Sequence, residues 1–313
     1  MNQRGTKLIN IDPYSVFIAI SIGLACGYVC YIARGRIFPG PGDFNWALDF
    51  ARAILSGEDP YDFPPSNLKV GYPLPVAFFG MPLMMLPGRL AGTVFFGISA
   101  FLLAFGILSK GKKWQLLIFI TFPFFDALIF AQWSPIITAS WFIPIIAPLF
   151  VLIKPNIAIP IAINRITKSG IILASVILLI SLIIYPTWPL RWLQTTGDYE
   201  YIIPFITMPL GPILLLSMIC WYDPKARLLL GLSLVPIRGA YDLVPLWLIP
   251  SSLPQMIFLV VLSWTVPIIN YSYAIQVRPH WVIPILYIPS LALVIFNNWP
   301  SIVSSVNRTR SKI

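Results

Sequence analysis

Long apolar runs separated by short charged segments fill most of this 313-residue chain. A helix of roughly 20 apolar residues crosses the hydrocarbon core of a bilayer, and the first run, residues 13–33, reaches that length. Because lipid offers the backbone no hydrogen-bond partners, such runs must form helices or a closed barrel, and the alternation of barrel strands is absent. The mean hydropathy of +0.83 excludes a soluble domain. We therefore predict an all-α fold, a polytopic membrane helix bundle of about 9–11 transmembrane helices that forms a single integral membrane domain over residues 1–313.

The other apolar runs set the expected crossings. The segment 73–87 is short and holds four prolines, so a half-depth re-entrant segment is favoured over a full crossing. The tail 297–313 is basic and ought to be cytoplasmic, yet the crossings given below place it on the extracytoplasmic side. One crossing is therefore misassigned, in 73–87, 154–168 or 281–296. The full crossings are expected at residues 90–109, 114–131, 134–153, 169–185, 201–221, 228–249, 254–275 and 281–296.

Basic residues lie in short clusters between these runs, which explains the net charge of +10. The clusters are Lys110 with Lys112 and Lys113, Arg165 with Lys168, and Lys225 with Arg227. The positive-inside rule places such clusters on the cytoplasmic side. Nucleic acid is excluded as a partner, since no continuous basic face is available to hold it.

Five of the eleven acidic residues lie together in residues 43–75. Acidic groups beside a membrane cost solvation energy unless they face water, which makes this stretch the first place to look for a functional site. The span count places residues 34–72 in a first extracytoplasmic loop and residues 186–200 in a second. Within the first loop, Asp43 is expected to cap an amphipathic surface helix over residues 43–56 that ends at Gly57.

A few ionisable residues interrupt the apolar runs: Asp126, Lys154, Arg238 and Asp242, with Arg191 in the second outer loop. Cations near helix breaks, opposite a water-facing carboxylate, suit a lipid-phosphate substrate. The cations would hold the phosphate, and the carboxylate would take a proton from an incoming hydroxyl. Simpler interpretations stay open: Asp43 as a helix cap, Lys154 as a lysine whose charge reaches the interface, and Arg238 with Asp242 as an i, i+4 helical pair.

Three sequence elements, in this order, resemble glycosyltransferase family 87 of the GT-C superfamily. The first is GDFNWALDFARAILSG followed by EDPYDF, YPLP and MPLMMLP; the second is AQWSP followed by IKPNIAIPIAINR; the third is PIRGAYDLVPL. The resemblance covers about residues 13–250.

This resemblance implies an inverting transfer of a sugar, a hexose such as mannose, from a polyprenyl-phosphate donor to a hydroxyl of a glycan or glycolipid acceptor. The reaction would take place on the extracytoplasmic side of a plasma or inner cell membrane, with Asp43 as catalytic base and no metal or cofactor. Membrane lipids, and other membrane proteins in a complex, are the remaining partners. The expected substrate-binding residues are Arg238, Lys154, Tyr241, Gln132, Arg191, Tyr61 and Tyr72.

Two other function classes fit the same residues. A lipid or solute transporter, or a flippase, would also use broken helices and charges at the membrane midplane. A catalytically inactive membrane assembly subunit is the second alternative.

Overall fold

The computed structural model describes residues 12–36, 39–62, 71–195, 201–270 and 279–310. Within these ranges the chain forms helices joined by short turns, with one isolated antiparallel bridge between Ile202 and Ile237 and no strand. The α-helices are α1 (Pro13–Arg36), α2 (Asn45–Ser56), α3 (Ala77–Gly80), α4 (Gly88–Lys110), α5 (Phe122–Ile129), α6 (Ser134–Ala139), α7 (Ala147–Val151), α8 (Pro155–Arg165), α9 (Lys168–Ile184), α10 (Trp188–Thr195), α11 (Pro224–Leu234), α12 (Leu253–Asn270), α13 (Pro279–Val282) and α14 (Ile288–Arg310). Between them lie 3-10 helices η1 (Gly42–Phe44), η2 (Leu74–Val76), η3 (Met81–Leu83), η4 (Lys113–Ile120), η5 (Pro144–Ile146), η7 (Pro204–Ile206), η8 (Gly211–Cys220) and η9 (Ala240–Leu248), and the π-helical turn η10 (Ile283–Tyr287).

The all-helical, membrane-type architecture agrees with the prediction, but the number of uninterrupted spans does not. In the described part of the chain, three helices are long and apolar enough to cross a bilayer, namely Pro13–Arg36, Gly88–Lys110 and Ile283–Ser304. The pair Lys168–Ile184 and Trp188–Thr195, bent by 93°, gives at most a fourth. Of the expected 9–11 transmembrane helices, the described part of the chain therefore forms three or four as helices long and apolar enough to cross a bilayer.

Proline and glycine explain the missing spans. The expected crossing 228–249 divides into α11 and η9, with Pro236 and Gly239 in the break. Proline lacks an amide hydrogen and its ring collides with the preceding turn, so a helix is interrupted there although the hydropathy stays high. Shorter helices also replace the single crossings expected at 114–131, 134–153 and 201–221.

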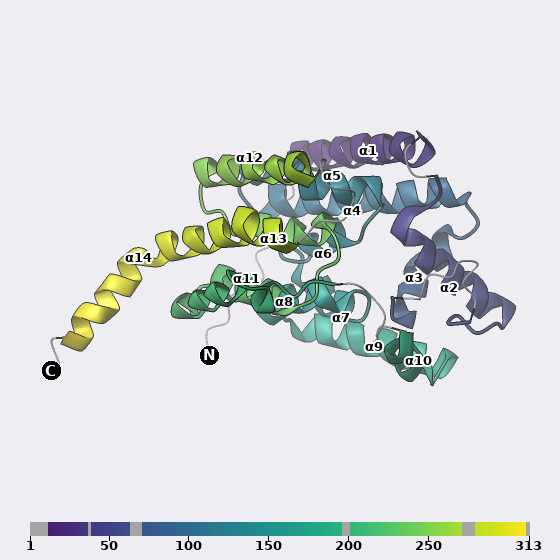
Figure 1. The fold of residues 1–313 in the computed structure, drawn as a ribbon. Coiled ribbons are helices and arrows are strands. Elements are labelled where there is room, and N and C mark those ends of the chain that lie inside the picture. Colours follow the sequence, from purple (N-terminus) through teal and green to yellow (C-terminus); the bar gives the residue numbers. More distant parts are fainter. Residues whose placement is uncertain (1–11, 37–38, 63–70, 196–200, 271–278, 311–313) are drawn as a thin grey trace.

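Two other expected boundaries bear on the membrane count. The proline-rich run 73–87 holds one short apolar helical stretch, Leu74–Leu83, which is too short for a full crossing. At the other end of the chain, the helix expected over 281–296 continues through α14 to Arg310, so part of the basic tail is helical. Figure 1 shows α14 projecting away from the other helices.

Helices α1 and α4 pack along each other over most of their length (Figure 1). Glycines permit this close approach, because a Cβ on Gly23 would lie 2.8 Å from the Cβ of Phe101 and 2.9 Å from the carbonyl oxygen of Gly97. Small residues at a helix crossing are the usual means by which membrane helices associate. The first two long spans therefore form a tight antiparallel pair.

The stretch expected to be a surface helix is the 3-10 turn η1 followed by α2. Its apolar side is buried at Ala47, Leu48 and Ala51, and it packs against α3, where a Cβ on Gly80 would collide with the carbonyl of Ala47. Gly57 ends the helix in the left-handed conformation with φ of 75°, as predicted.

An aromatic cluster beneath η1 fixes that turn on the bundle. The buried indole of Trp133, which precedes α6, lies 4.5 Å from the ring centroid of Phe95 and 5.8 Å from that of Phe44. Phe44 in turn stacks on Phe95 at 4.2 Å. Aromatic pairs at these distances add to the free energy gained from burial. The residue next to Asp43 is therefore held against α4.

Candidate functional site

The backbone around Asp43 is fixed to the end of α5. The amide of Asp43 donates to the carbonyl oxygen of Phe130 at 2.8 Å. Gly42 has a φ of 70°, and a Cβ at that position would collide with the same carbonyl, so only glycine allows the approach. The prediction that Asp43 caps α2 is wrong: the cap position is Phe44, and no side chain caps the helix there.

The partly buried Asp43 carboxylate is instead bound by Tyr72, from the YPLP element. The buried hydroxyl of Tyr72 donates a hydrogen bond to Oδ2 of Asp43. Tyr61 supports this arrangement from behind, since its hydroxyl donates to the carbonyl oxygen of Tyr72 at 3.3 Å. Two expected binding residues therefore act on Asp43, Tyr72 directly and Tyr61 through the backbone of Tyr72.

Lys154 lies in the middle of the neighbouring polar groups. Its Nζ donates to Oε1 of Gln132 at 3.1 Å, lies 2.8 Å from Oδ1 of Asp242, and is 5.0 Å from the ring centroid of Tyr241. The side chain is buried, at the residue directly before α8, so the interpretation of Lys154 as an interface-reaching lysine is wrong. A lysine buried in this way requires an anionic partner, and Asp242 provides it.

The Arg238–Asp242 interpretation also changes. Oδ2 of Asp242 accepts the backbone amide of Arg238 at 3.0 Å, and the carboxylate pairs with Lys154. Arg238 precedes η9 in the break between α11 and η9, so the two residues do not lie on one α-helix. The expected i, i+4 helical ion pair is replaced by a turn that Asp242 closes.

Two residues outside the set of expected catalytic and substrate-binding residues hold this turn in place. Oδ2 of Asp126 in α5 accepts the amide of Tyr241 at 3.0 Å, and Nδ2 of Asn156 donates to the carbonyl of Pro236 at 3.0 Å. A carboxylate inside an apolar helix needs a hydrogen-bond donor, so Asp126 could have been identified as a structural partner from sequence, but its target could not. Asn156 had no such signal.

Electrostatics connects these groups to Asp43. Burial raises the pKa of Asp43 above its ordinary value, while the charge of Lys154, the hydroxyl of Tyr72 and the charge of Arg238 act in the opposite direction. The structure therefore brings together seven residues from five separate segments, which we call the Asp43 cluster: Asp43, Tyr72, Gln132, Lys154, Arg238, Tyr241 and Asp242.

Arg191 does not belong to this cluster. It lies in α10 and pairs with the acidic loop, 3.0 Å from Oδ2 of Asp59 and in contact with Asp62, while the hydroxyl of Tyr185 donates to Asp59 at 2.5 Å. The expectation that Arg191 is a reserve cation for a phosphate is therefore not supported by its place. It joins α10 to the acidic segment that follows α2 instead; residues 63–70 and 196–200 lie outside the described ranges.

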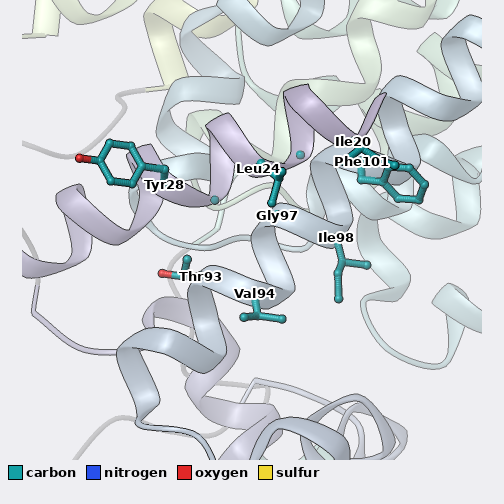
Figure 2. Close-up of a pocket in the computed structure, with 10 residues that line it drawn as sticks. Ile20, Leu24, Tyr28, Thr93, Val94, Gly97, Ile98 and Phe101 are labelled. Atoms are coloured by element: carbon teal, nitrogen blue, oxygen red, sulfur yellow. The ribbon is translucent and has the colours of Figure 1, made fainter. Parts of the chain in front are cut away.

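Two hollows lie outside the Asp43 cluster. The first, about 390 Å³, is an apolar groove between α1 and α4. Figure 2 shows Tyr28 and Thr93 at one end of this groove and Ile20 and Phe101 at the other. The second, about 250 Å³, lies where α4 meets η4 and includes three lysines. In the described part of the chain no group of three or more His, Cys, Asp or Glu residues is placed to hold a metal ion.

Comparison of the chain with known protein families, with characterised proteins and with solved structures gives no significant match. The interpretation of the Asp43 cluster therefore depends on its own chemistry. A partly buried carboxylate with a raised pKa, a tyrosine that orients it and two nearby cations form a group that can accept a proton and stabilise a developing anion.

Proposed function

We propose that the chain is a membrane glycosyltransferase of the GT-C type that transfers a sugar from a polyprenyl-phosphate donor to an acceptor hydroxyl. The observation that carries the proposal is that Asp43 shares one cluster with the cations Lys154 and Arg238, which lie far away in the sequence. An otherwise apolar chain gains nothing in stability by gathering charges around one carboxylate, because each must be desolvated. Function is the better reason for the arrangement.

In this reaction Asp43 acts as the base. Its free carboxylate oxygen takes the proton of the acceptor hydroxyl while that oxygen attacks the sugar C1 from the face opposite the phosphate. The bond between C1 and the phosphate oxygen breaks, and polyprenyl phosphate leaves with both bonding electrons. Tyr72 orients the carboxylate through its hydrogen bond, so it is a positioning residue.

The leaving phosphate needs a cation held close to the base. Lys154 forms an ion pair with Asp242 at 2.8 Å. Arg238 is held at its backbone by Asp242, at a break in the helix, and its charge acts on Asp43 and Tyr72. We therefore assign the phosphate to Arg238, with Lys154, Gln132 and Tyr241 forming the wall behind it. A guanidinium can bind two phosphate oxygens at once.

The apolar groove between α1 and α4 supports a donor with a hydrocarbon chain. Tyr28 and Thr93 mark one end of the groove (Figure 2). This end is close to the Asp43 segment, because Gly92, the neighbour of Thr93, packs so tightly against Pro41 that a Cβ would collide with the Pro41 carbonyl. A prenyl chain in this groove would enter from the lipid side and present its phosphate near η1.

The position of Asp43 along α4 supports an extracytoplasmic reaction. The Asp43 segment packs at the first turns of α4, whereas Lys110 ends the helix. At 1.5 Å per residue a helix of 23 residues is about 34 Å long, enough to separate two membrane faces. If the lysines are cytoplasmic under the positive-inside rule, Asp43 faces the outside of the cell membrane.

A transporter of lipids or solutes is the second candidate, favoured by one observation. Lys154 and Asp242 form a buried ion pair at two helix breaks, an arrangement that also occurs in the transport pathways of membrane proteins.

One experiment separates the candidates. The purified protein is reconstituted in liposomes with labelled polyprenyl-phosphate hexoses and a mixture of glycolipid acceptors. Labelled product supports glycosyl transfer, whereas movement of the donor across the bilayer without product supports transport. If neither occurs with any hexose, the proposed transferase activity is wrong and the chain acts as an inactive assembly subunit.

A further inference from the structure

The second hollow lies at the end of α4 opposite the Asp43 cluster and is independent of the proposed function. It has a volume of about 250 Å³. We call it the basic hollow, and its walls include Lys110 at the end of α4, Lys112 just before η4, Lys225 in α11, and the aromatic residues Trp114 and Trp141. The sequence places Lys110 and Lys112 in one cytoplasmic cluster and Lys225 in another. The fold instead brings all three to one cavity.

Lys225 is fixed in the wall of this hollow. Its Nζ donates to the carbonyl oxygen of Pro250 at 2.7 Å and to Oγ of Ser251 at 2.9 Å, and both of these residues also line the cavity. A lysine held in this way presents a charge at a defined place, unlike a mobile surface lysine.

The positive charge in the basic hollow is only partly compensated. Burial lowers the pKa of Lys225 to about 8, Asp223 acts in the opposite direction, and the charge of Lys112 lowers it further. Asp223 is the nearby carboxylate, and it is engaged by the side chain of Asn298 and by the amide of Lys225. A further cation lies close by, since the guanidinium of Arg165 is 4.0 Å from the ring centroid of Trp141. Three lysines facing one another repel, and an anion between them would remove that repulsion.

The wall composition indicates which anion fits. The lysines and Gln115 can donate hydrogen bonds, while Trp114 and Trp141 are typical of the boundary between headgroups and hydrocarbon. Basic pockets between membrane helices on the cytoplasmic side are a known way of binding phosphate-bearing lipid headgroups. We propose that the basic hollow is a binding site for a phosphate group, carried by an anionic phospholipid or by a soluble phosphate.

The test uses the full chain in a neutral detergent, with thermal unfolding followed by tryptophan fluorescence. Short-chain phosphatidylglycerol, short-chain phosphatidylcholine and inorganic phosphate are titrated separately. A ligand that binds only the folded protein raises the unfolding midpoint in a saturable way. We expect phosphatidylglycerol to do so and phosphatidylcholine not to. An equal shift with inorganic phosphate would identify a soluble anion as the source of the phosphate group.

The variants assign the effect to the basic hollow. Lys110→Gln with Lys112→Gln changes two exposed residues, so folding is kept, and each lost lysine should weaken binding about five-fold. Lys113→Gln is the matched control, because this exposed lysine adjoins the hollow without being among its lining residues. Lys225→Gln should weaken binding as well. The proposal is overturned if no phosphate-bearing anion shifts the midpoint, if phosphatidylcholine gives the same shift as phosphatidylglycerol, or if the double variant binds like the wild type.

Discussion

Replacing Lys154 by methionine tests how the Asp43 cluster is held together. The change keeps most of the side-chain volume but removes the cation that pairs with the fully buried carboxylate of Asp242, which still accepts the backbone amide of Arg238. Breaking a buried ion pair on one side costs about 3–5 kcal/mol of folding free energy, because the remaining charge is not compensated. The hydrogen bond to Gln132 and the contact with Tyr241 are lost as well.

The measurement is the free energy of unfolding in mixed micelles, obtained from denaturant titration. Lys113→Met is the control, since an exposed lysine should change stability by less than about 0.5 kcal/mol. Adding Asp242→Asn to Lys154→Met removes the uncompensated charge and should recover about 2 kcal/mol or more, a coupling typical of residues in direct contact. If Lys154→Met costs no more than the control, or if the double variant loses the sum of the two single losses, the buried pair does not hold this cluster.

Three further predictions concern Tyr72 and Arg238 in the Asp43 cluster and Arg191 outside it. Tyr72→Phe removes a hydrogen bond that lowers the pKa of Asp43. Because the ionised base is the active form, the acidic limb of the pH–rate profile should move to higher pH. An unchanged acidic limb would contradict the role of Tyr72. Arg238→Lys keeps the charge but loses two-point phosphate binding, so KM for the donor should rise about ten-fold while the free energy of unfolding is unchanged. An unchanged KM would rule out Arg238 as the residue that binds the donor phosphate. Arg191→Ala should lower the free energy of unfolding by less than about 1 kcal/mol, because its ion pairs with Asp59 and Asp62 are partly exposed. A larger loss would show that these ion pairs contribute more to stability than their exposure indicates.

The sequence predicts the long helices well, because hydropathy and length are sufficient for them. The first span was expected at 13–33 and is Pro13–Arg36, and the span expected at 90–109 is Gly88–Lys110. The glycine that ends α2 was also identified, since a left-handed residue is needed there. Hydropathy fails where prolines divide an apolar run, because the run keeps its composition while the backbone leaves the helix.

The residues of the site could be named from sequence, but their pairing could not. Charges inside apolar runs must have partners, which identifies Asp126, Lys154 and Asp242 one by one. Which partner each charged side chain takes depends on the direction of the backbone where a helix is interrupted. The break at Pro236 and Gly239 turns Asp242 toward Lys154 instead of toward the side chain four residues earlier. The contact of Asp43 with Tyr72 could not be predicted for the same reason, since it requires the folded loop.

The most direct test of the central proposal compares Asp43→Asn with Asp49→Asn in the transfer assay with labelled polyprenyl-phosphate hexoses. Asn keeps the shape of Asp43 but cannot accept the proton, so turnover should fall by about 10² or more while the unfolding midpoint is kept. Asp49 is the matched control, because it is also acidic and buried, and pairs with Asn45 and Arg52 on α2. Asp49→Asn should retain most of the activity. Full activity in Asp43→Asn, or an equal loss in both variants, would contradict the role of Asp43 as the catalytic base.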